Sequence, residues 1–400
     1  MMASAFPAGR AWIELNMENL RHNVNVLQHR LPDTCRLMPA IKADAYGHGA
    51  LHIAKELNTC GINAFCVASV QEGVNLRLHG IKGEVLILGY THPMHFHMLI
   101  KYSLMQTVID YSYATILNGY NEKIKVHIMI DTGMHRLGER AENTTNIINI
   151  FKCENLEICG IYTHLGNSDS NEQPEKEMTQ LQIKKFNNVI SIIEAQGLTI
   201  PTKHIISSYG VFNYPELAYD YARVGIALFG MLSRKDDTKN YDTNLRPVLS
   251  IKTRVSAVIK LKAGDIAGYG LSFKVEKDME IAALAIGYAD GVPRSLSCGK
   301  GHILINGKKA KIISHICMDQ TIIDITNTPS VKQGDIAVII GNSGEEEITA
   351  CDIAEKADTI ANEVLSRLGS RLEKYIMPQG SCEKYPGYGD SPPPYQTFRI

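Results

Sequence analysis

The stretch MPAIKADAYGHGA, residues 38–50, places one lysine directly after a short apolar run. The run LMPAI, residues 37–41, has the length and composition of a buried strand, so Lys42 is predicted at the carboxyl end of that strand. In α/β folds, ligands bind at the edge where the carboxyl ends of parallel strands meet. The stretch therefore predicts an α/β fold with an amine at its ligand-binding edge. The alternative is an ordinary solvated lysine on the surface.

Short apolar runs alternate with helix-length segments up to about residue 230. Good helix patterns fill residues 50–60, 69–80 and 175–197, and the last of these ends in a glycine that suits a helix end. Eight strands with seven crossovers predict a (β/α)8 TIM barrel. The predicted strands are Leu37–Ile41, Ala64–Val67, Glu84–Leu88, Leu104–Val108, Lys125–Ile130, Leu156–Tyr162, His204–Ser207 and Ala222–Leu228.

The pattern changes after the polar stretch SRKDDTKNYDTN, residues 233–244. From Val248 onward, β-branched runs follow one another between glycine and asparagine turn signals, which indicates a β-rich C-terminal domain. We therefore expect the barrel to occupy residues 11–240 and the β-rich domain residues 245–377. Residues 378–400 are rich in proline and glycine without an apolar period, and are predicted to form a poorly ordered tail.

The composition favours a small-molecule partner. Hydrophobic residues make up 44% and charged residues 21%, which is ordinary for a globular protein with a substantial core. A formal charge of -1 gives no field that would attract nucleic acid or an anionic membrane. The nine cysteines include no CxxC pair, which argues against a structural metal site and for a reducing compartment. A cytoplasmic location is expected, unless a membrane-spanning portion precedes this sequence.

A second group of candidate residues lies in the last two strands of the predicted barrel. Barrels often bind phosphate through backbone N–H groups and small hydroxyls after strands 7 and 8. Strand 7 ends in SSYG, residues 207–210, and Gly225 and Ile226 are predicted in the middle of strand 8. Taken singly, these residues also suit ordinary turns. A lysine that can bond to an aldehyde and a phosphate site in the same barrel mouth together indicate pyridoxal phosphate.

Six motifs give the chain a resemblance to the alanine racemase family of fold-type III pyridoxal phosphate enzymes, over roughly residues 11–377. They occur in the order of that family, and only their combination is specific. The motifs are AIKADAYGHG (40–49), IDTGMHRLG (130–138), ARVGIALFG (222–230), GYGLSF (268–273), AIGYADG (285–291) and ICMDQ (316–320).

The resemblance implies that Lys42 holds the cofactor covalently and that Tyr46 contacts its phosphate. Ser208 and the backbone of Gly225 and Ile226 would complete the phosphate site.

By the same resemblance, Arg223 would face the pyridine nitrogen. A guanidinium stays protonated and does not give the ring nitrogen a full proton, so the cofactor becomes a poorer electron sink and transamination is disfavoured. The alternative for Arg223 is a buried structural ion pair.

Racemisation needs one base on each side of the cofactor plane, because a proton leaves one face of Cα and returns to the other. In the family these bases are the cofactor lysine and a tyrosine from the partner subunit, which corresponds to Tyr269 here. His164 is the residue that the resemblance places beside Tyr269 in the cofactor site. By itself, His164 would suit an ordinary core histidine.

The resemblance assigns Arg136 to the phenolic oxygen of the cofactor and the substrate carboxylate, assisted by the backbone of Met318. Asp319 and Tyr288 would line the entrance, with Cys317 beside them. Since these residues come from the second domain, the resemblance implies a head-to-tail homodimer with shared active sites, and a nearly inactive monomer.

Three positions depart from the family pattern. Met129 stands where the family commonly has a carbamylated lysine that steadies the arginine, and ISSY replaces an ANSA-like segment. Asn362 stands where alanine racemases have a tyrosine around the substrate methyl group. This asparagine is similar to that in the serine racemases of vancomycin-resistance clusters, whose racemase domain follows a membrane-spanning portion and supplies D-serine for modified peptidoglycan precursors. We therefore expect serine to be a good substrate and alanine a competing one, with a modest preference.

Three other functions are compatible with parts of the pattern. An alanine racemase for cell-wall D-alanine shares every motif. A fold-type III decarboxylase of basic amino acids shares the barrel and the lysine, but usually meets the pyridine nitrogen with a carboxylate. A non-catalytic carrier of pyridoxal phosphate would lack the second domain. No residues indicate a metal site.

Overall fold

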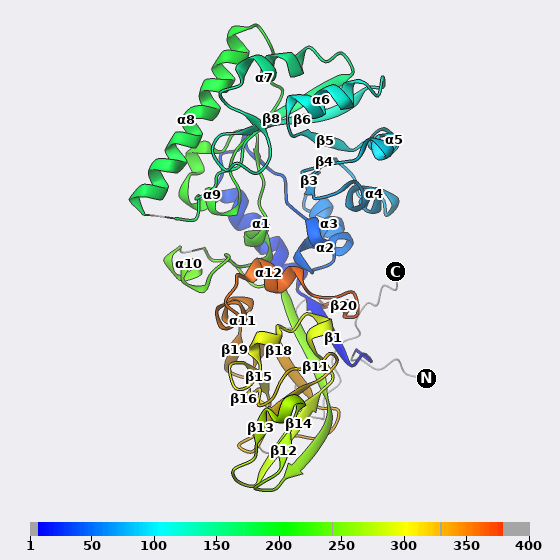
Figure 1. Ribbon diagram of the computed structural model, residues 1–400, viewed down its shortest axis with the longest axis vertical. Coiled ribbons are helices and arrows are strands. Elements are labelled where there is room, and N and C mark those ends of the chain that lie inside the picture. Colours follow the sequence, from blue (N-terminus) through cyan, green and yellow to red (C-terminus); the bar gives the residue numbers. More distant parts are fainter. Residues whose placement is uncertain (1–6, 171, 242, 329, 379–400) are drawn as a thin grey trace.

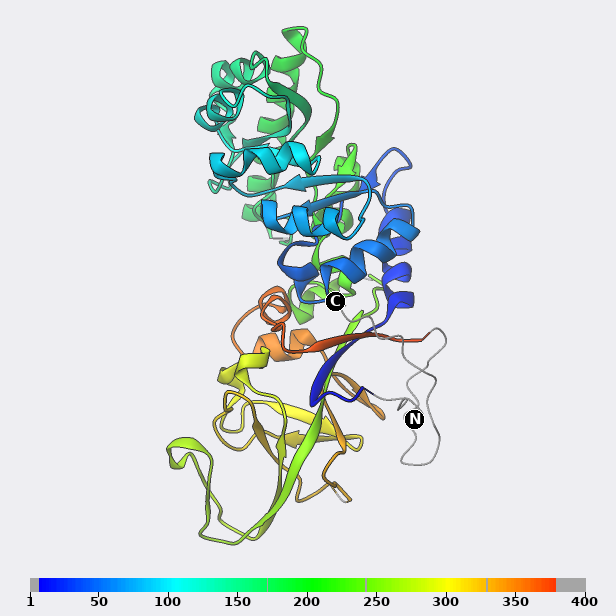
Figure 2. The same cartoon turned by 90° about the vertical axis from the view of Figure 1, so that its right-hand side faces the viewer.

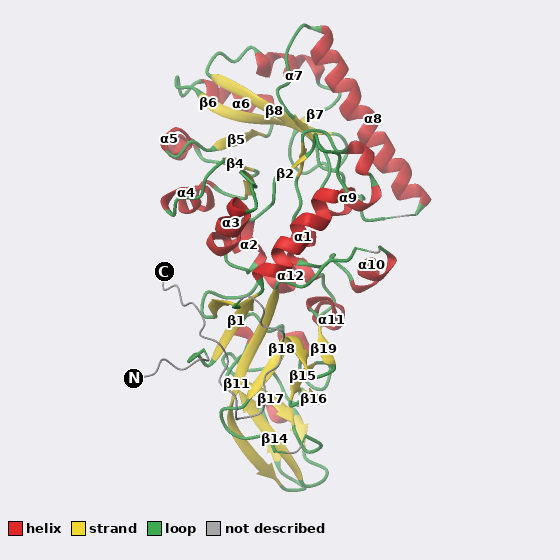
Figure 3. Ribbon diagram, turned by 180° about the vertical axis from the view of Figure 1, so that it is seen from behind, coloured by secondary structure: helices red, strands yellow, loops and turns green. Residues whose placement is uncertain are grey.

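The computed structural model describes residues 7–170, 172–241, 243–328 and 330–378. It has two lobes, a helix-rich lobe at the top of Figure 1 and a strand-rich lobe at the bottom. Figure 3 shows the same division by colour, with most helices in the upper lobe. Except for Pro378, the tail predicted over residues 378–400 lies outside the described residues. Within the described ranges, no helix combines the length and apolar character that a membrane span requires.

Eight parallel strands close the upper lobe into a barrel. Strands β3 to β6, β8 and β9 pair in that order, and β10 pairs with β2. Single bridges between Ala40 and Cys66 and between Ser207 and Arg223 join these two groups into a ring. The predicted (β/α)8 barrel is thereby confirmed. Its strands are β2 (Arg36–Leu37), β3 (Ala64–Val67), β4 (Glu84–Ile87), β5 (Met105–Val108), β6 (Ile124–Asp131), β8 (Leu156–Tyr162), β9 (Lys203–His204) and β10 (Tyr221–Ala222), with the short β7 (Glu139–Arg140) beside β6.

Helices surround this barrel, as the side view in Figure 2 shows. Local sequence signals fix where several of them begin: the side chain of Ser69 accepts a hydrogen bond from the N–H of Glu72 at the start of α4, as N-cap serines do. The predicted helices within residues 50–60, 69–80 and 175–197 are confirmed. The barrel helices are α1 (Met17–His29), α3 (Ala50–Thr59), α4 (Val70–Leu78), α5 (Phe96–Lys101), α6 (Tyr111–Asn118), α7 (Thr144–Phe151), α8 (Gln173–Ala195) and α9 (Ser208–Asn213).

Three predicted strands end well before the residues expected: the first, the last, and the one predicted over His204–Ser207, which is observed as Lys203–His204. The first regular strand stops at Leu37, before Pro39, which has no N–H to donate. Beyond it, an isolated bridge at Ala40 and single backbone hydrogen bonds, such as that from the N–H of Ala40 to the carbonyl of Val224 (2.7 Å), continue the pairing. The last strand, predicted over Ala222–Leu228, ends at Ala222. Gly225 therefore does not lie inside a strand: it precedes a 3-10 helix, η3 (Ile226–Phe229). A Cβ at Gly225 would lie 2.6 Å from the hydroxyl of Tyr46, so close approach requires glycine there.

The lower lobe is built on a nine-stranded sheet that bears out the β-rich C-terminal domain. Its strands follow the path β16-β15-β18-β11-β1-β20, with β14, β17 and β19 attached beside it. They are β1 (Ala11–Leu15), β11 (Leu249–Leu261), β14 (Met279–Leu284), β15 (His302–Ile305), β16 (Lys308–Lys311), β17 (Thr321–Asp324), β18 (Ile336–Ser343), β19 (Glu346–Ile348) and β20 (Glu373–Ile376). A separate hairpin joins β12 (Ile266–Ala267) to β13 (Phe273–Lys274). The helices here are α10 (Lys235–Asn240), α11 (Ala350–Lys356) and α12 (Ala361–Ser366).

The first strand of the chain belongs to the lower lobe. Strand β1 pairs antiparallel with β11, where Ile13 faces Ile251, and parallel with β20, where Ile13 faces Lys374. Residues 11–15 were expected in the barrel domain of residues 11–240, and their pairing places them in the other sheet instead. The chain thus starts in the lower lobe, makes the whole barrel, and returns.

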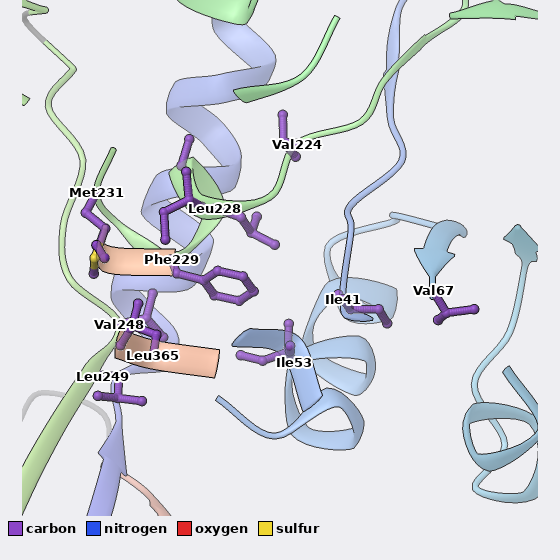
Figure 4. Close-up of a cluster of buried hydrophobic side chains, with 14 of the residues drawn as sticks. Ile41, Ile53, Val67, Val224, Leu228, Phe229, Met231, Val248, Leu249 and Leu365 are labelled. Carbon is purple, nitrogen blue, oxygen red and sulfur yellow. The ribbon is translucent and has the colours of Figure 1, made fainter. Parts of the chain in front are cut away.

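One continuous apolar core connects the two lobes. It includes barrel residues and residues of the second sheet in a single cluster of buried side chains. Figure 4 shows Phe229 of η3, Val248 before β11 and Leu365 of α12 close together at the junction. The lobes are therefore joined by packed side chains, and α12 is part of that contact.

Candidate active site

A cavity of about 440 Å³ opens at the carboxyl ends of the barrel strands. Loops that follow these strands supply most of its wall, and α12 of the lower lobe closes one side. Ligand sites of such barrels lie at this end. The predicted site residues that line the cavity are Lys42, Tyr46, Arg136, His164, Ser208, Arg223, Gly225, Ile226 and Asn362.

The segment that carries the lysine forms a left-handed turn. In α2 (Lys42–Tyr46), residues 43–46 all have φ between 52° and 54°. A left-handed conformation costs about 1–2 kcal/mol for each residue that has a Cβ, and isolated glycines are the usual exception. Contacts with the rest of the protein must therefore hold the turn. The sequence gives no signal for this conformation, since alanine and tyrosine ordinarily avoid it.

Part of the support for this turn comes from the lower lobe. The Asp44 carboxylate accepts a hydrogen bond from the N–H of Ala50 (2.7 Å) and pairs with the ammonium of Lys374 on β20 (3.0 Å). Gly47 follows with φ 77°, and a Cβ there would lie 2.3 Å from the carbonyl oxygen of Leu365. The turn therefore rests directly on α12, and glycine permits the contact.

Lys42 lies on the cavity wall and is partly buried. Burial lowers the pKa of its amine, the positive charge of Arg136 lowers it further, and Cys66 and Glu72 act weakly in the opposite direction. A neutral amine is the form that attacks a carbonyl carbon. Lys42 is thus a partly buried amine on the cavity wall with a lowered pKa, unlike a solvated surface lysine.

A cluster of hydrogen-bond donors lies on the other side of the cavity. The hydroxyl of Ser208 accepts hydrogen bonds from the N–H groups of Gly225 (2.9 Å) and Ala227 (3.3 Å). The phenol of Tyr46 lies against Gly225, and burial, with a smaller effect of Cys66, raises its pKa to about 12, so it remains a donor at neutral pH. The two N–H groups orient the Ser208 hydroxyl, and the O–H donors of Ser208 and Tyr46 suit a phosphate group.

Arg223 is buried beneath the cavity and makes no ion pair with a described carboxylate. Its guanidinium donates hydrogen bonds to Nδ1 of His204 (2.8 Å), the carbonyl of Thr163 (2.7 Å) and Nδ1 of His164 (3.3 Å). Its carbon lies 4.8 Å from the ring centre of Tyr162. The ion-pair alternative is therefore wrong for the described residues, and the positive charge is free to act on whatever the cavity holds.

The histidines around Arg223 are held neutral. An arginine only donates, so Nδ1 of His204 accepts, and its other nitrogen carries the proton that it donates to Nδ1 of His127 (2.8 Å). Burial, together with the charge of Arg223, lowers the pKa of His127 and of His164 to about 3, and that of His204 well below its usual value. These neutral rings orient Arg223 without cancelling its charge.

Arg136 has no hydrogen bond or ion pair with any residue that the structure describes, and its side chain is exposed. Met129 lines the cavity as a buried apolar residue, so no anion comes from that position. The nearby Asp131 bonds instead to the N–H and ring of His135 (2.9 and 2.8 Å). Arg136 can therefore bind an anion that enters the cavity.

The remaining predicted residues do not reach this cavity within one chain. Tyr269, Tyr288 and Met318 are exposed by 70%, 41% and 54% on the lower lobe. They lie on neighbouring loops, since the N–H of Tyr288 bonds to the carbonyl of Cys317 (3.0 Å). Asp319 is paired with Arg371 (2.6 Å). Tyr269, Tyr288, Met318 and Asp319 are therefore not part of the cavity wall within one chain.

Asn362 faces the cavity from α12, and its side-chain oxygen is buried without a hydrogen-bond partner among the described residues. Sequence reasoning did not single out Ser233 on the cavity wall, whereas Tyr209, which also lines it, belongs to the SSYG segment expected near the phosphate. The Tyr209 hydroxyl donates to Asp237 (2.5 Å) and accepts from the N–H of Ser233 (2.9 Å). The replacement of ANSA by ISSY was the available signal for Tyr209.

Two family profiles match almost the whole of both lobes. The profile of the alanine racemase N-terminal domain covers residues 15–233, and that of the alanine racemase C-terminal domain covers residues 248–376. The chain belongs to the alanine racemase family.

Individual relatives agree with this assignment. An amino-acid racemase of Enterococcus faecalis is 44% identical over 91% of this chain and 51% of its own length. A serine/alanine racemase of Enterococcus gallinarum is 35% identical over 92% of the chain and 52% of its own length. The chain thus spans about half the length of these relatives. The solved alanine racemase of Clostridium difficile 630 superposes with a TM-score of 0.86, at 32% identity, over 93% of this chain and 97% of that one.

Pyridoxal phosphate is the cofactor of the alanine racemase family, and the residues of this racemase homologue fit it. The cavity has a nucleophilic amine on one wall, phosphate-binding donors on another, and an arginine without a counter-ion below. Lys42 would hold the aldehyde carbon, Tyr46 and Ser208 the phosphate, and Arg223 the ring nitrogen. Among the described residues, no three histidine, cysteine or acidic side chains are grouped as a metal site would require.

Proposed function

We propose that this protein is a pyridoxal phosphate-dependent amino-acid racemase that interconverts the L- and D-forms of serine and of alanine. One observation carries the proposal: the partly buried amine of Lys42 and the guanidinium of Arg223, which has no ion pair with a described carboxylate, line one cavity. A carboxylate in place of Arg223 would favour decarboxylase or transaminase chemistry. The family assignment supports the same activity.

When bound, the cofactor withdraws electrons from the substrate Cα and makes its proton acidic. Lys42 would take or return that proton at Nζ on one face. The phenol of Tyr269 from a second copy would do so on the opposite face, with His164 beside it. Arg136 would orient the substrate carboxylate through its two parallel N–H groups, assisted by the backbone of Met318 from that copy.

We infer that the working protein is a head-to-tail homodimer with shared active sites. The exposure of Tyr269, Tyr288 and Met318 on the lower lobe supports this, since large apolar side chains gathered on one face commonly mark an interface. Asp319 and Tyr288 would then line the entrance to the partner's cavity.

Serine is the substrate that we expect Asn362 to favour. Its buried side-chain oxygen has no partner among the described residues, and a substrate hydroxyl would provide one. The serine/alanine racemase of Enterococcus gallinarum, one of the relatives described above, is named for this pair of substrates. We further propose that the product D-serine enters modified peptidoglycan precursors, in the context of vancomycin resistance.

The decisive test follows product chirality. Purified protein loaded with pyridoxal phosphate is given L-serine or L-alanine, and the D-enantiomer is measured on a chiral column. We expect D-enantiomers from both substrates and none from a Lys42→Ala variant. Release of CO₂ or a keto acid in place of the D-amino acid would refute the racemase proposal. Cofactor binding without turnover of either substrate would indicate a carrier, and exclusive turnover of alanine would indicate a dedicated alanine racemase.

A further inference from the structure

The carboxylate of Glu72 joins two loops at the mouth of the barrel. One oxygen accepts a hydrogen bond from the N–H of Ala43 (2.8 Å), which directly follows Lys42. The other oxygen accepts from the N–H of Ala68 (2.6 Å), at the end of the next strand. Ala68 lines the same cavity as Lys42. A single side chain thus ties the lysine turn to the neighbouring barrel loop.

The position of Glu72 in its helix makes this arrangement notable. The sequence SVQE, residues 69–72, has the spacing of a capping box, in which the glutamate would reach back to the N–H of Ser69. Ser69 does accept the hydrogen bond from the N–H of Glu72 (3.3 Å). The carboxylate, however, bonds to Ala43 and Ala68. The helix start thereby gives up one reciprocal bond, and the lysine turn gains one.

We propose that Glu72 is a positioning residue, which holds the left-handed turn of residues 43–46 and thereby directs the amine of Lys42 into the cavity. This inference depends on the proposal that Lys42 holds the cofactor. The turn is the natural target of such support, because four successive residues with side chains adopt a conformation that they ordinarily avoid. The carboxylate of Glu72 accepts a hydrogen bond from Ala43, the first of these residues, and so stabilises the left-handed conformation against an ordinary loop conformation.

Other contacts of the turn act at different places. Asp44 bonds to the lower lobe through Lys374, and the ring of His48 lies 2.9 Å from the carbonyl oxygen of Tyr46. Both lie at or beyond the centre of the turn. The bond from Ala43 to Glu72 lies at its start, next to Lys42, and it comes from the barrel. Loss of Glu72 should therefore affect the direction of the lysine more than the packing of the lobes.

The test measures cofactor binding as well as catalysis. Apoprotein is titrated with pyridoxal phosphate, and the visible absorbance of the lysine-bound cofactor gives the dissociation constant. We expect Glu72→Ala to raise that constant by roughly ten- to a hundredfold, since two hydrogen bonds to a charged group are lost. Glu72→Gln, which keeps one acceptor oxygen and the side-chain shape, should have an intermediate effect. The matched control is Glu122→Ala, because Glu122 is exposed before β6 and has no contact with the cavity.

A rescue variant distinguishes loss of the turn conformation from loss of the negative charge of Glu72 as the cause of weaker cofactor binding. Glycine adopts the left-handed conformation without steric cost, and Ala43 is exposed, so Ala43→Gly removes little packing. In the Glu72→Ala background, Ala43→Gly should recover most of the lost affinity. Hydrogen exchange should also be faster at residues 43–46 in Glu72→Ala than in the control.

Three results would overturn the inference. Unchanged affinity for pyridoxal phosphate in both Glu72 variants would show that the turn is stable without Glu72. A loss that Ala43→Gly fails to recover would assign the effect to charge or to general instability, and so would a loss with unchanged exchange at residues 43–46. Lys42→Ala tests separately whether Lys42 holds the cofactor. If this variant still shows the absorbance of lysine-bound cofactor, the proposed cofactor site is wrong, independently of the results for Glu72.

Discussion

The side chain of Asn362 should decide how well serine competes with alanine. Its oxygen is buried at the cavity without a partner among the described residues, so a substrate hydroxyl would satisfy it. Leucine has nearly the same shape and neither donates nor accepts. A hydrogen bond between uncharged groups contributes about 0.5–1.5 kcal/mol, which corresponds to roughly a two- to thirteenfold change in kcat/KM. We expect Asn362→Leu to lower kcat/KM for L-serine by this factor and to spare L-alanine.

The assay compares initial rates of D-enantiomer formation from L-serine and L-alanine, alone and in mixtures. Asn362→Tyr, which also fills space, should shift the ratio further toward alanine than Asn362→Leu does. Ser366→Ala is the matched control, because Ser366 is exposed on the same helix and does not line the cavity. The reasoning is refuted if the serine-to-alanine ratio stays the same in both Asn362 variants.

Three more predictions concern the histidines, the dimer and the arginine. Burial, and then the charge of Arg223, lowers the pKa of His127 and His164 to about 3 from the usual 6.5. Between pH 3 and pH 6.5 the unfolded chain therefore binds more protons than the folded chain. The free energy of unfolding of the apoprotein should fall by roughly 1.4 kcal/mol per pH unit for each histidine as the pH drops below about 6.5. Urea unfolding at pH 7 and pH 5 measures this, and equal stabilities would contradict it. The inactive variants Lys42→Ala and Tyr269→Phe are mixed in equal amounts and allowed to exchange subunits. The mixture should recover about a quarter of the wild-type activity if each site takes one residue from each copy. No recovery despite exchange would contradict shared active sites. Arg223→Glu should increase keto-acid release relative to racemisation, which a coupled dehydrogenase assay detects, because a carboxylate supports a protonated ring nitrogen.

Sequence periodicity predicted the barrel because most of its strands are bounded by local signals. It was wrong at the ends of three strands, which stop before Pro39, at His204 and at Ala222, although apolar residues follow in each case. It also assigned residues 11–15 to the barrel. The partner strands of β1 lie more than two hundred residues further along the chain, and no local pattern reveals such a pairing.

The site was predictable to the extent that each residue type has a chemical signature. A lysine after a strand, and glycines and serines after the last strands, indicated the two sides of the cavity. The left-handed turn after Lys42 and the bond from Ala43 to Glu72 gave no such signal, since tertiary contacts override the preferences of alanine. Ser233, which gave no signal either, lines the cavity from a separate segment, where its N–H donates to the Tyr209 hydroxyl (2.9 Å).

The contacts of the lysine turn also link Lys42, the proposed cofactor residue, to Asn362, the proposed substrate residue of the other lobe. Asp44 of the turn pairs with Lys374 of β20, and Gly47 lies against the carbonyl of Leu365 on α12. The same helix presents Asn362 to the cavity. A shift of the lower lobe would therefore move the turn that carries Lys42 together with the side chain that we expect to select the substrate. Because packed junctions of this kind have few alternative arrangements, the distance between the cofactor lysine and the selecting amide is set by the fold of one chain. Tyr269, which we propose as the second base, does not line this cavity within one chain, so under that proposal its position depends on how two copies associate.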